Sequence, residues 1–313
     1  MKIAIIGAGT WGMNHVKTLI HMNVDIAVFE PSKINKEKIF KLFPNIKFLD
    51  KMNDAIKFDA VIITAPTPLH EKLGSFFLSH KVPCFIEKPL AFKTEEAKSL
   101  VDLSKKNKTL VAVGHIEHFN PAFIKLKEYV SKDENIFEIS INRHGMARPG
   151  FDTSVDVIFD LMIHDIGMMI DLLGTQDAIM NINAFSVPCS TDPFGFVKAL
   201  IQFQSGRIVN LSSSRISHQK QRQIEVQSLE NKYIANLIDQ TTQMYTHNEV
   251  RANDKLSSRK SLLELELDDF INAVTHKNKL TVPISLAYNA VKVAGIIKGL
   301  VMKNNILQTN KQL

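Results

Sequence analysis

The chain has 313 residues, more than one domain usually contains, so its length predicts two domains. Hydrophobic residues make up 45% and charged residues 22%, which excludes a disordered, collagen-like or low-complexity chain. The formal net charge is +6, but the basic residues are scattered among acidic ones. This pattern is typical of solvated helix faces and argues against a nucleic acid partner.

Cysteine usage and hydropathy indicate a cytoplasmic protein. Cys84 and Cys189 are the only cysteines, and their spacing fits neither a disulfide framework nor a zinc site. The N-terminus lacks a signal-peptide core, and the late apolar segment is interrupted by Lys292 and Lys298. We therefore expect no structural metal and no membrane association.

The first part of the chain alternates short apolar runs with longer segments of mixed polarity, which predicts a doubly wound parallel sheet covered by helices. The predicted strands are Ile3–Ile6, Ile26–Phe29, Ala60–Ile63, Cys84–Ile86 and Leu110–Val113. The predicted helices are Trp11–Met22, Lys33–Leu42, Leu69–Ser79 and Glu95–Lys106.

After Pro121 the strands alternate polar and apolar residues, which predicts an open, mostly antiparallel sheet. These strands are Asn183–Val187, Lys198–Gln204 and Arg207–Ser212. The helices expected here are Val155–Leu173, which Gly174 should end, Leu262–Val274 and Ile284–Met302. We therefore expect an α/β protein with domains at residues 1–118 and 119–313.

A GxGxxG motif directly follows the first predicted strand and opens the first helix, at Gly7, Gly9 and Gly12. In this context the glycines serve a tight turn, close backbone approach to a pyrophosphate, and helix–strand contact. Free amide groups at the helix N-terminus then bind the phosphates, so Thr10 and Trp11 join the cofactor candidates. The motif predicts a Rossmann domain in residues 1–118.

Glu30 ends the second predicted strand, eighteen positions after Gly12. An acidic side chain there can accept hydrogen bonds from ribose hydroxyls and repel a 2′-phosphate, which favours NAD over NADP. A surface carboxylate capping the next helix is the alternative, and Lys33 nearby could support NADP.

Two further loops leave the predicted parallel sheet at its carboxyl edge, where ligands bind in this fold. Thr64, Pro66 and His70 belong to the first loop and are predicted to line the cofactor. Glu87 and Lys88 belong to the second and are placed beside the nicotinamide. The Lys88 ammonium can donate to a substrate oxygen, although a lysine after a strand is more often a surface charge.

Asp160 and His164 stand four residues apart in an otherwise apolar predicted helix and so share one face. Buried polar groups need partners, and a substrate site would provide them. A core Asp–His hydrogen bond is the alternative. His115 and His118 could suggest a metal pair, but no third ligand follows at a suitable spacing.

Together the GxGxxG turn, Glu87-Lys88-Pro89 and Asp160-xxx-His164 resemble the glucose-fructose oxidoreductase/inositol dehydrogenase/rhizopine catabolism (Gfo/Idh/MocA) family over nearly the whole chain. The resemblance implies NAD(P)-dependent oxidation or reduction of a sugar or cyclitol hydroxyl, with Lys88, Asp160 and His164 as the catalytic set. It also implies homodimers or homotetramers, to which an open sheet face is suited.

Within that family, residues 113–122 and 155–166 look like enzymes that oxidise the C3 hydroxyl of UDP-N-acetylglucosamine. This likeness implies a UDP-sugar substrate and a ketone that a downstream aminotransferase converts for diamino-sugar lipid A. His164 would take the hydroxyl proton while hydride leaves C3. His118 and Gly167 stand where we would expect Arg and Asp.

Five residues are candidates for substrate binding. Guanidinium groups suit phosphate oxygens, which favours three of them for the diphosphate. The candidates are Arg143, Arg148, Arg215, His115 and Asn120. Two alternatives stay open: a dehydrogenase of a free sugar or inositol, and a non-catalytic NAD-responsive regulator, which the retained Lys, Asp and His argue against.

Overall fold

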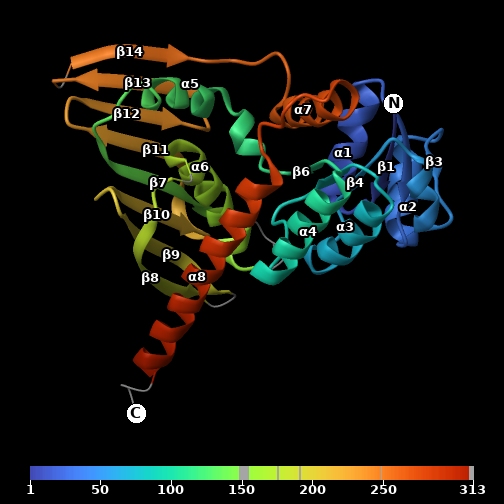
Figure 1. The fold of residues 1–313 in the computed structure, drawn as a ribbon, viewed down its shortest axis with the longest axis horizontal. Helices are drawn as coiled ribbons and strands as arrows, with labels where there is room; N and C mark the ends of the chain where they lie inside the picture. Colours follow the sequence, from blue (N-terminus) through green and yellow to red (C-terminus); the bar gives the residue numbers. More distant parts are fainter. Residues whose placement is uncertain (148–154, 175, 190–191, 248, 310–313) are drawn as a thin grey trace. The chain divides into compact units, whose positions relative to one another are not determined.

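The computed structural model describes residues 1–147, 155–174, 176–189, 192–247 and 249–309 (Figure 1). It forms two compact units, one of Met1–Ile116 with Lys260–Val291 and one of Glu117–Arg259 with Lys292–Leu313. The expected single boundary at residue 118 therefore does not describe the division. The cause is α7 (Leu262–His276), whose apolar face is buried in the core of the first sheet.

Six parallel strands form the sheet of the first unit, in the order β3-β2-β1-β4-β5-β6. This is the doubly wound order of a Rossmann fold, as predicted. The strands are β1 (Lys2–Ile6), β2 (Asp25–Phe29), β3 (Lys47–Phe48), β4 (Ala60–Ile63), β5 (Cys84–Ile86) and β6 (Val111–Val113). Only β3 escaped prediction, because two residues carry no pattern.

The helices of this unit cover the sheet in the predicted places. Besides α7, they are α1 (Thr10–His21), α2 (Lys33–Leu42), α3 (His70–Ser79) and α4 (Thr94–Asn107), with the 3-10 segments η1 (Met52–Lys57) and η2 (Thr67–Leu69); the 3-10 segment η3 (Ile116–Phe119) begins where the first part of this unit ends. Because the paired strands are parallel, the carboxyl ends of β1, β2, β4 and β5 meet at one edge. The predicted cofactor residues of this unit follow those ends.

Among the described residues, eight strands form the second sheet, in the order β14-β13-β12-β11-β7-β10-β9-β8. Every pairing is antiparallel except that of β7 with β10, so the sheet is mostly antiparallel, as predicted. The strands are β7 (Ile136–Met146), β8 (Ile179–Cys189), β9 (Asp192–Phe203), β10 (Ile208–Ser214), β11 (Ile216–Ser228), β12 (Asn231–Asn236), β13 (Thr241–Thr246) and β14 (Glu249–Lys255).

Helices α5 (Pro121–Val130) and α6 (Ile163–Leu173) pack against one face of this second sheet (Figure 1). The opposite face is apolar at one end. Phe185 and Val187 on β8 are 60% and 53% exposed, and Leu200 and Ile208 on the neighbouring strands are 41% and 40% exposed. Leu200 pairs with Asn183, which lies on the same side of β8 as Phe185 and Val187. Ile208 pairs with Gln202, which lies on the same side of β9 as Leu200, so the four apolar side chains share one face.

The helix expected from Val155 to Leu173 begins later and in another form. Residues Ile158–Met162 make a π-helical turn, in which the Ile163 amide donates to the carbonyl of Ile158, and α6 follows. Such turns are rare and often occur at functional sites. The helix ends at Leu173, before Gly174, as predicted, and Gly174 adopts φ +71°.

The last helix, α8 (Ile284–Thr309), is long and apolar enough over 284–304 to cross a membrane by length and composition alone. We expected no such segment. Ala290, Ala294 and Ile297 are each fully buried, so at these positions α8 serves as a core helix.

Candidate active site

The glycine turn after β1 requires two of its glycines for space. Gly7 adopts φ +92°, and a Cβ there would lie 2.9 Å from the Ala65 backbone. A Cβ on Gly12 would collide with the Gly7 carbonyl and with Thr64 Oγ1. Gly9 differs, because its Cβ would meet nothing within 4 Å. The turn therefore has no space for a side chain at Gly7 or Gly12, whereas the space beside Gly9 is open.

The open side of this turn suits an anion. Gly9 is the N-cap of α1 and supplies no side-chain cap, so the helix N-terminus keeps its donor capacity. Thr10 and Trp11 are exposed there, with Trp11 at 47%. The residues present therefore fit the pyrophosphate of a dinucleotide, as the motif predicts.

Glu30 at the end of β2 reaches the same turn. One carboxylate oxygen accepts from the Ala8 amide and the other accepts from the Ser32 amide at 2.8 Å. A carboxylate oxygen can accept more than one hydrogen bond, so Glu30 keeps capacity for ribose hydroxyls. Ser32 caps α2 through its own hydroxyl, so Glu30 is not that cap.

The loop after β4 packs against the glycine turn and hydrogen-bonds to it. Thr64 Oγ1 donates to the Gly7 carbonyl at 2.5 Å, and Pro66 precedes η2 as its N-cap. His70 is 1% exposed, and its Nδ1 and Nε2 lie 2.9 and 2.8 Å from the carbonyls of Pro89 and Ala65. Burial lowers the pKa of His70, although both carbonyls oppose that shift. We predicted a direct cofactor contact for His70, but the geometry makes it an internal support.

Glu87 and Lys88 follow β5 at the same edge. Glu87 Oε1 lies 2.7 Å from His15 Nε2, and Oε2 accepts from the Lys88 amide at 3.1 Å. A Cβ on Gly114 would lie 2.9 Å from Glu87 Oε2, so glycine makes room for this carboxylate. Glu87 is thus engaged internally, whereas Lys88 is half-buried.

Glu266 on α7 is a second carboxyl of this region that the sequence did not identify. It is 3% exposed, and its Oε1 has no hydrogen-bond partner among the described residues. Burial, with a contribution from the negative charge of Glu87, raises the pKa of Glu266 well above its usual value. We therefore take Glu266 to be neutral in the folded protein.

Asp160, in the π-helical turn of the second unit, is held by an arginine. Its Oδ2 accepts from Arg215 Nη2 at 2.9 Å, and the same nitrogen donates to the Val155 carbonyl at 2.8 Å. The Asp160 side chain is 25% exposed and Arg215 is 5% exposed, so the carboxylate is the accessible partner. Arg215 is committed internally, which argues against the predicted diphosphate contact.

His164 lies on the first turn of α6 and is 9% exposed. The next residue, Asp165, is fully buried and accepts from Arg143 Nε at 2.8 Å. Arg143 also donates to Glu117 at 2.9 Å, and Arg222 donates to the same oxygen at 3.1 Å. Arg143 thus lies between two carboxylates and anchors α6 to β7, rather than being free for a diphosphate as predicted.

The pKa values of the two carboxyl groups beside Arg143, those of Asp165 and Glu117, are shifted in opposite directions. Burial raises the pKa of Asp165 to about 6, although the Arg143 charge favours ionisation. Burial would also raise the pKa of Glu117, but the charges of Arg143 and Arg222 outweigh it and lower that pKa. The difference follows from the second guanidinium, which Glu117 contacts directly.

The other substrate candidates have structural contacts of their own. Asn120 caps α5 through its Oδ1, while its Nδ2 donates to the Leu237 carbonyl at 2.9 Å. It is 1% exposed, which argues against the predicted substrate contact. His115 is also 1% exposed, and Arg148 lies outside the described residues.

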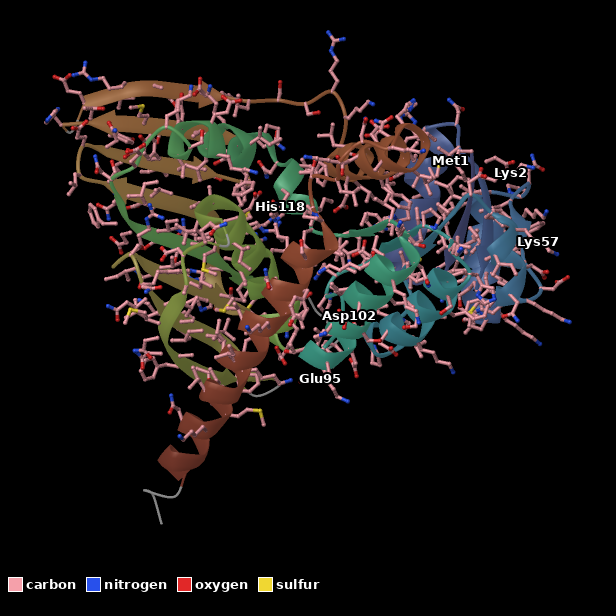
Figure 2. The ribbon with its side chains drawn as sticks, viewed as in Figure 1. Met1, Lys2, Lys57, Glu95, Asp102 and His118 are labelled. Atoms are coloured by element: carbon pink, nitrogen blue, oxygen red, sulfur yellow. The ribbon has the colours of Figure 1, made fainter. Side chains whose placement is uncertain are left out.

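The histidine that could suggest a metal pair with His115 contacts an aspartate instead. His118, labelled in Figure 2, has its Nδ1 3.0 Å from Asp171 Oδ2, and Lys127 Nζ contacts both oxygens of Asp171. Over the described part of the chain, no group of three or more His, Cys, Asp or Glu residues could hold a metal ion.

Sequence comparisons relate the chain to sugar and cyclitol dehydrogenases. The family model described as "Oxidoreductase family, NAD-binding Rossmann fold" matches residues 1–115. UDP-N-acetylglucosamine 3-dehydrogenase from Acidithiobacillus ferrooxidans is 25% identical over 287 residues, 88% of this chain and 88% of that enzyme. Inositol 2-dehydrogenase from Rhodococcus jostii is 28% identical over 179 residues, 53% of this chain and 48% of that enzyme.

Solved structures share the whole fold. That of UDP-N-acetylglucosamine 3-dehydrogenase from A. ferrooxidans matches with a TM-score of 0.88 at 23% identity, covering 96% of this chain and 97% of that chain. Biliverdin reductase from Synechocystis sp. PCC 6803, in complex with biliverdin and NADP+, matches with a TM-score of 0.79 at 18% identity, covering 96% and 98%. Since the named substrates differ so widely, the fold alone does not select one.

Proposed function

We propose that this chain, a member of the Gfo/Idh/MocA oxidoreductase family acting on CH–OH groups, uses NAD to oxidise C3 of UDP-N-acetylglucosamine to a ketone. The observation that carries the proposal is the similarity to UDP-N-acetylglucosamine 3-dehydrogenase, which extends over 88% of both chains. The product would be a substrate for an aminotransferase, toward diamino-sugar lipid A.

The choice of NAD rests on Glu30 and on the glycine turn. Glu30 brings a negative charge to the turn whose open side lies above Gly9, which disfavours a 2′-phosphate. Gly7 and Gly12 shape this turn, and Thr10 and Trp11 begin the helix above it. When bound, NAD supplies the hydride acceptor.

Three side chains have chemical roles in this proposal. His164 accepts the proton of the C3 hydroxyl as general base, and Lys88 donates a hydrogen bond to the same oxygen. Asp160 orients these groups and is itself held by Arg215. The backbone on either side of Lys88 is held by two buried histidines, because His15 contacts Glu87 and His70 contacts the carbonyl of Pro89.

A second candidate keeps this chemistry on inositol. It is favoured by the 28% identity with inositol 2-dehydrogenase, although that similarity covers about half of each chain. The internal engagement of Arg143 and Arg215 also leaves the diphosphate of a UDP-sugar without those two partners.

We further propose that the exposed apolar end of the second sheet mediates homodimer or homotetramer formation. Phe185, Val187 and Leu200 would be removed from water there. Phe185→Lys should shift the mass measured by light scattering toward the monomer, whereas Val250→Lys on β14 should not. An unchanged mass for Phe185→Lys would contradict this assignment.

The test of the reaction uses NAD with UDP-N-acetylglucosamine deuterated at C3, and myo-inositol in parallel. Absorbance of NADH reports turnover, and mass spectrometry should find a ketone product and deuterium in the reduced cofactor. His164→Asn and Lys88→Met should each lower turnover by about 10²–10⁴-fold. NADH formation with myo-inositol alone would select the second candidate, and none with either substrate would refute both.

A further inference from the structure

Two buried histidines hold the segment that carries Lys88 from its two ends. At the start, His15 Nε2 on α1 lies 2.7 Å from Glu87 Oε1, and Glu87 Oε2 accepts from the Lys88 amide. At the end, His70 Nδ1 on α3 lies 2.9 Å from the Pro89 carbonyl. His15 is fully buried and His70 is 1% exposed, so neither ring is available to a ligand in solution.

The same histidines connect this segment to the glycine turn. His15 lies on α1, three residues after Gly12. His70 Nε2 is 2.8 Å from the carbonyl of Ala65, and Ala65 is the residue against which Gly7 packs. Each ring therefore joins the Lys88 segment to a part of the turn predicted to bind the pyrophosphate.

We propose that His15 and His70 are positioning residues that clamp residues 87–89 and thereby fix the backbone that carries Lys88. This inference rests on the proposed function, in which Lys88 contacts the reacting oxygen. A lysine side chain is long and flexible, so the reach of its ammonium depends on where the backbone is held. Small displacements of such a group reduce turnover strongly.

The packing around Glu87 indicates that its place is specified. Gly114 leaves room for the carboxylate, since a Cβ there would lie 2.9 Å from Oε2. The His15 ring packs edge-on against Phe85 at a centroid distance of 5.4 Å, which fixes the imidazole as well. Both partners of the His15–Glu87 contact are thus held independently of each other.

Amide substitutions separate the contacts of His70. Asn places its amide near the position of Nδ1, and Gln places it near that of Nε2. His70→Asn should therefore keep the Pro89 contact and most of the turnover, whereas His70→Gln should lose about tenfold or more in kcat. His15→Gln should likewise restore what His15→Leu loses. His80→Gln is the matched control, because His80 is exposed and its side chain contacts the carbonyl and the ring of Phe76 in its own helix region.

The measurements are kcat, the Kd for NAD from Trp11 fluorescence, and thermal unfolding, each repeated in a Lys88→Met background. If the histidines act through Lys88, His15→Leu and His70→Gln lower kcat, leave the Kd within about twofold, and cost nothing further in that background. Equal losses in both backgrounds, or losses confined to the Kd, would overturn the clamp. Wild-type turnover of Lys88→Met would instead refute the proposed function.

If His15→Leu fails to fold, the His70→Asn and His70→Gln pair decides. Equal kcat values for those two amides would overturn the clamp, because only one of them preserves the contact with Pro89. A higher kcat for His70→Asn supports it.

Discussion

The glycine turn allows folding and cofactor binding to be perturbed separately. Gly7 and Gly9 lie two residues apart, yet a methyl group meets different surroundings at each. At Gly7 it would lie 2.9 Å from the Ala65 Cα and amide nitrogen, with the backbone at φ +92°. At Gly9 it would meet nothing within 4 Å. We therefore predict that Gly7→Ala destabilises the fold and that Gly9→Ala impairs cofactor binding alone.

The magnitude for Gly7→Ala combines two costs. An L-residue at positive φ costs about 1–2 kcal/mol, and forcing a methyl group into packed backbone costs about 1–3 kcal/mol. Reduced freedom of the unfolded chain returns about 0.4–1 kcal/mol. The net loss of about 1–4.6 kcal/mol corresponds to a fall in Tm of roughly 2–18 °C for a unit of this size.

For Gly9→Ala the change in stability should stay within about 1 kcal/mol, the cost of a poorer N-cap. The methyl group would occupy the space through which a pyrophosphate reaches the helix amides. Losing one charge-assisted hydrogen bond costs about 1.5–3 kcal/mol, which raises the Kd for NAD about 10–150-fold.

Cofactor binding can be followed by tryptophan fluorescence, because Trp11 is the only tryptophan in the sequence and lies at the start of α1, in this turn. Its fluorescence during titration with NAD gives the Kd, and thermal unfolding gives Tm. Wild-type affinity in Gly9→Ala would refute the assignment of the open side of the turn to the pyrophosphate. A Tm for Gly7→Ala equal to that of Gly9→Ala would refute the steric argument.

Three further substitutions test the charges described above. Glu30→Gln should raise the Kd for NAD about 10–100-fold and reduce the preference over NADP, since a carboxylate is replaced by a neutral amide. Glu117→Gln should lower Tm at pH 7 by leaving Arg143 less compensated. Because the folded-state pKa of Glu117 is lowered, its contribution to stability is present above about pH 4.5 and is lost as pH falls through the folded value, so the difference in Tm from wild type should shrink in acid. Glu266 has a raised pKa, so its contribution is present below about pH 4.5 and is lost as pH rises through the folded value; Glu266→Gln should therefore become more stable than wild type in alkali.

Each of these has a contrary outcome. Unchanged discrimination between NAD and NADP in Glu30→Gln would remove the reason for preferring NAD. Parallel profiles of Tm against pH for wild type and Glu117→Gln would show that this carboxylate does not titrate with folding. An unchanged alkaline limb in Glu266→Gln would mean that Glu266 is charged in the folded protein.

Local pattern was enough to predict the first sheet, because buried parallel strands are continuous apolar runs and the intervening helices have characteristic length. The glycine turn could be predicted in the same way, because its residues are neighbours in the sequence. Strand β7 and the strands β11 to β14 were not predicted individually, because their register and pairing depend on contacts with distant strands. The return of α7 to the first unit likewise depends on where its apolar face finds a core.

Position along the chain and the family resemblance identified Lys88, Asp160 and His164 as candidates, and their roles stay predictions. The contacts of Arg143 and Asn120 were decided by tertiary structure, because the carboxylates that Arg143 meets and the Leu237 carbonyl that Asn120 meets come from distant parts of the chain. The pairing of His15 with Glu87 joins positions 72 residues apart and has no local signal beyond a polar residue on a buried helix face. Order along the chain thus determined which groups are present, whereas folding determined which of them neutralise one another and which stay available for chemistry.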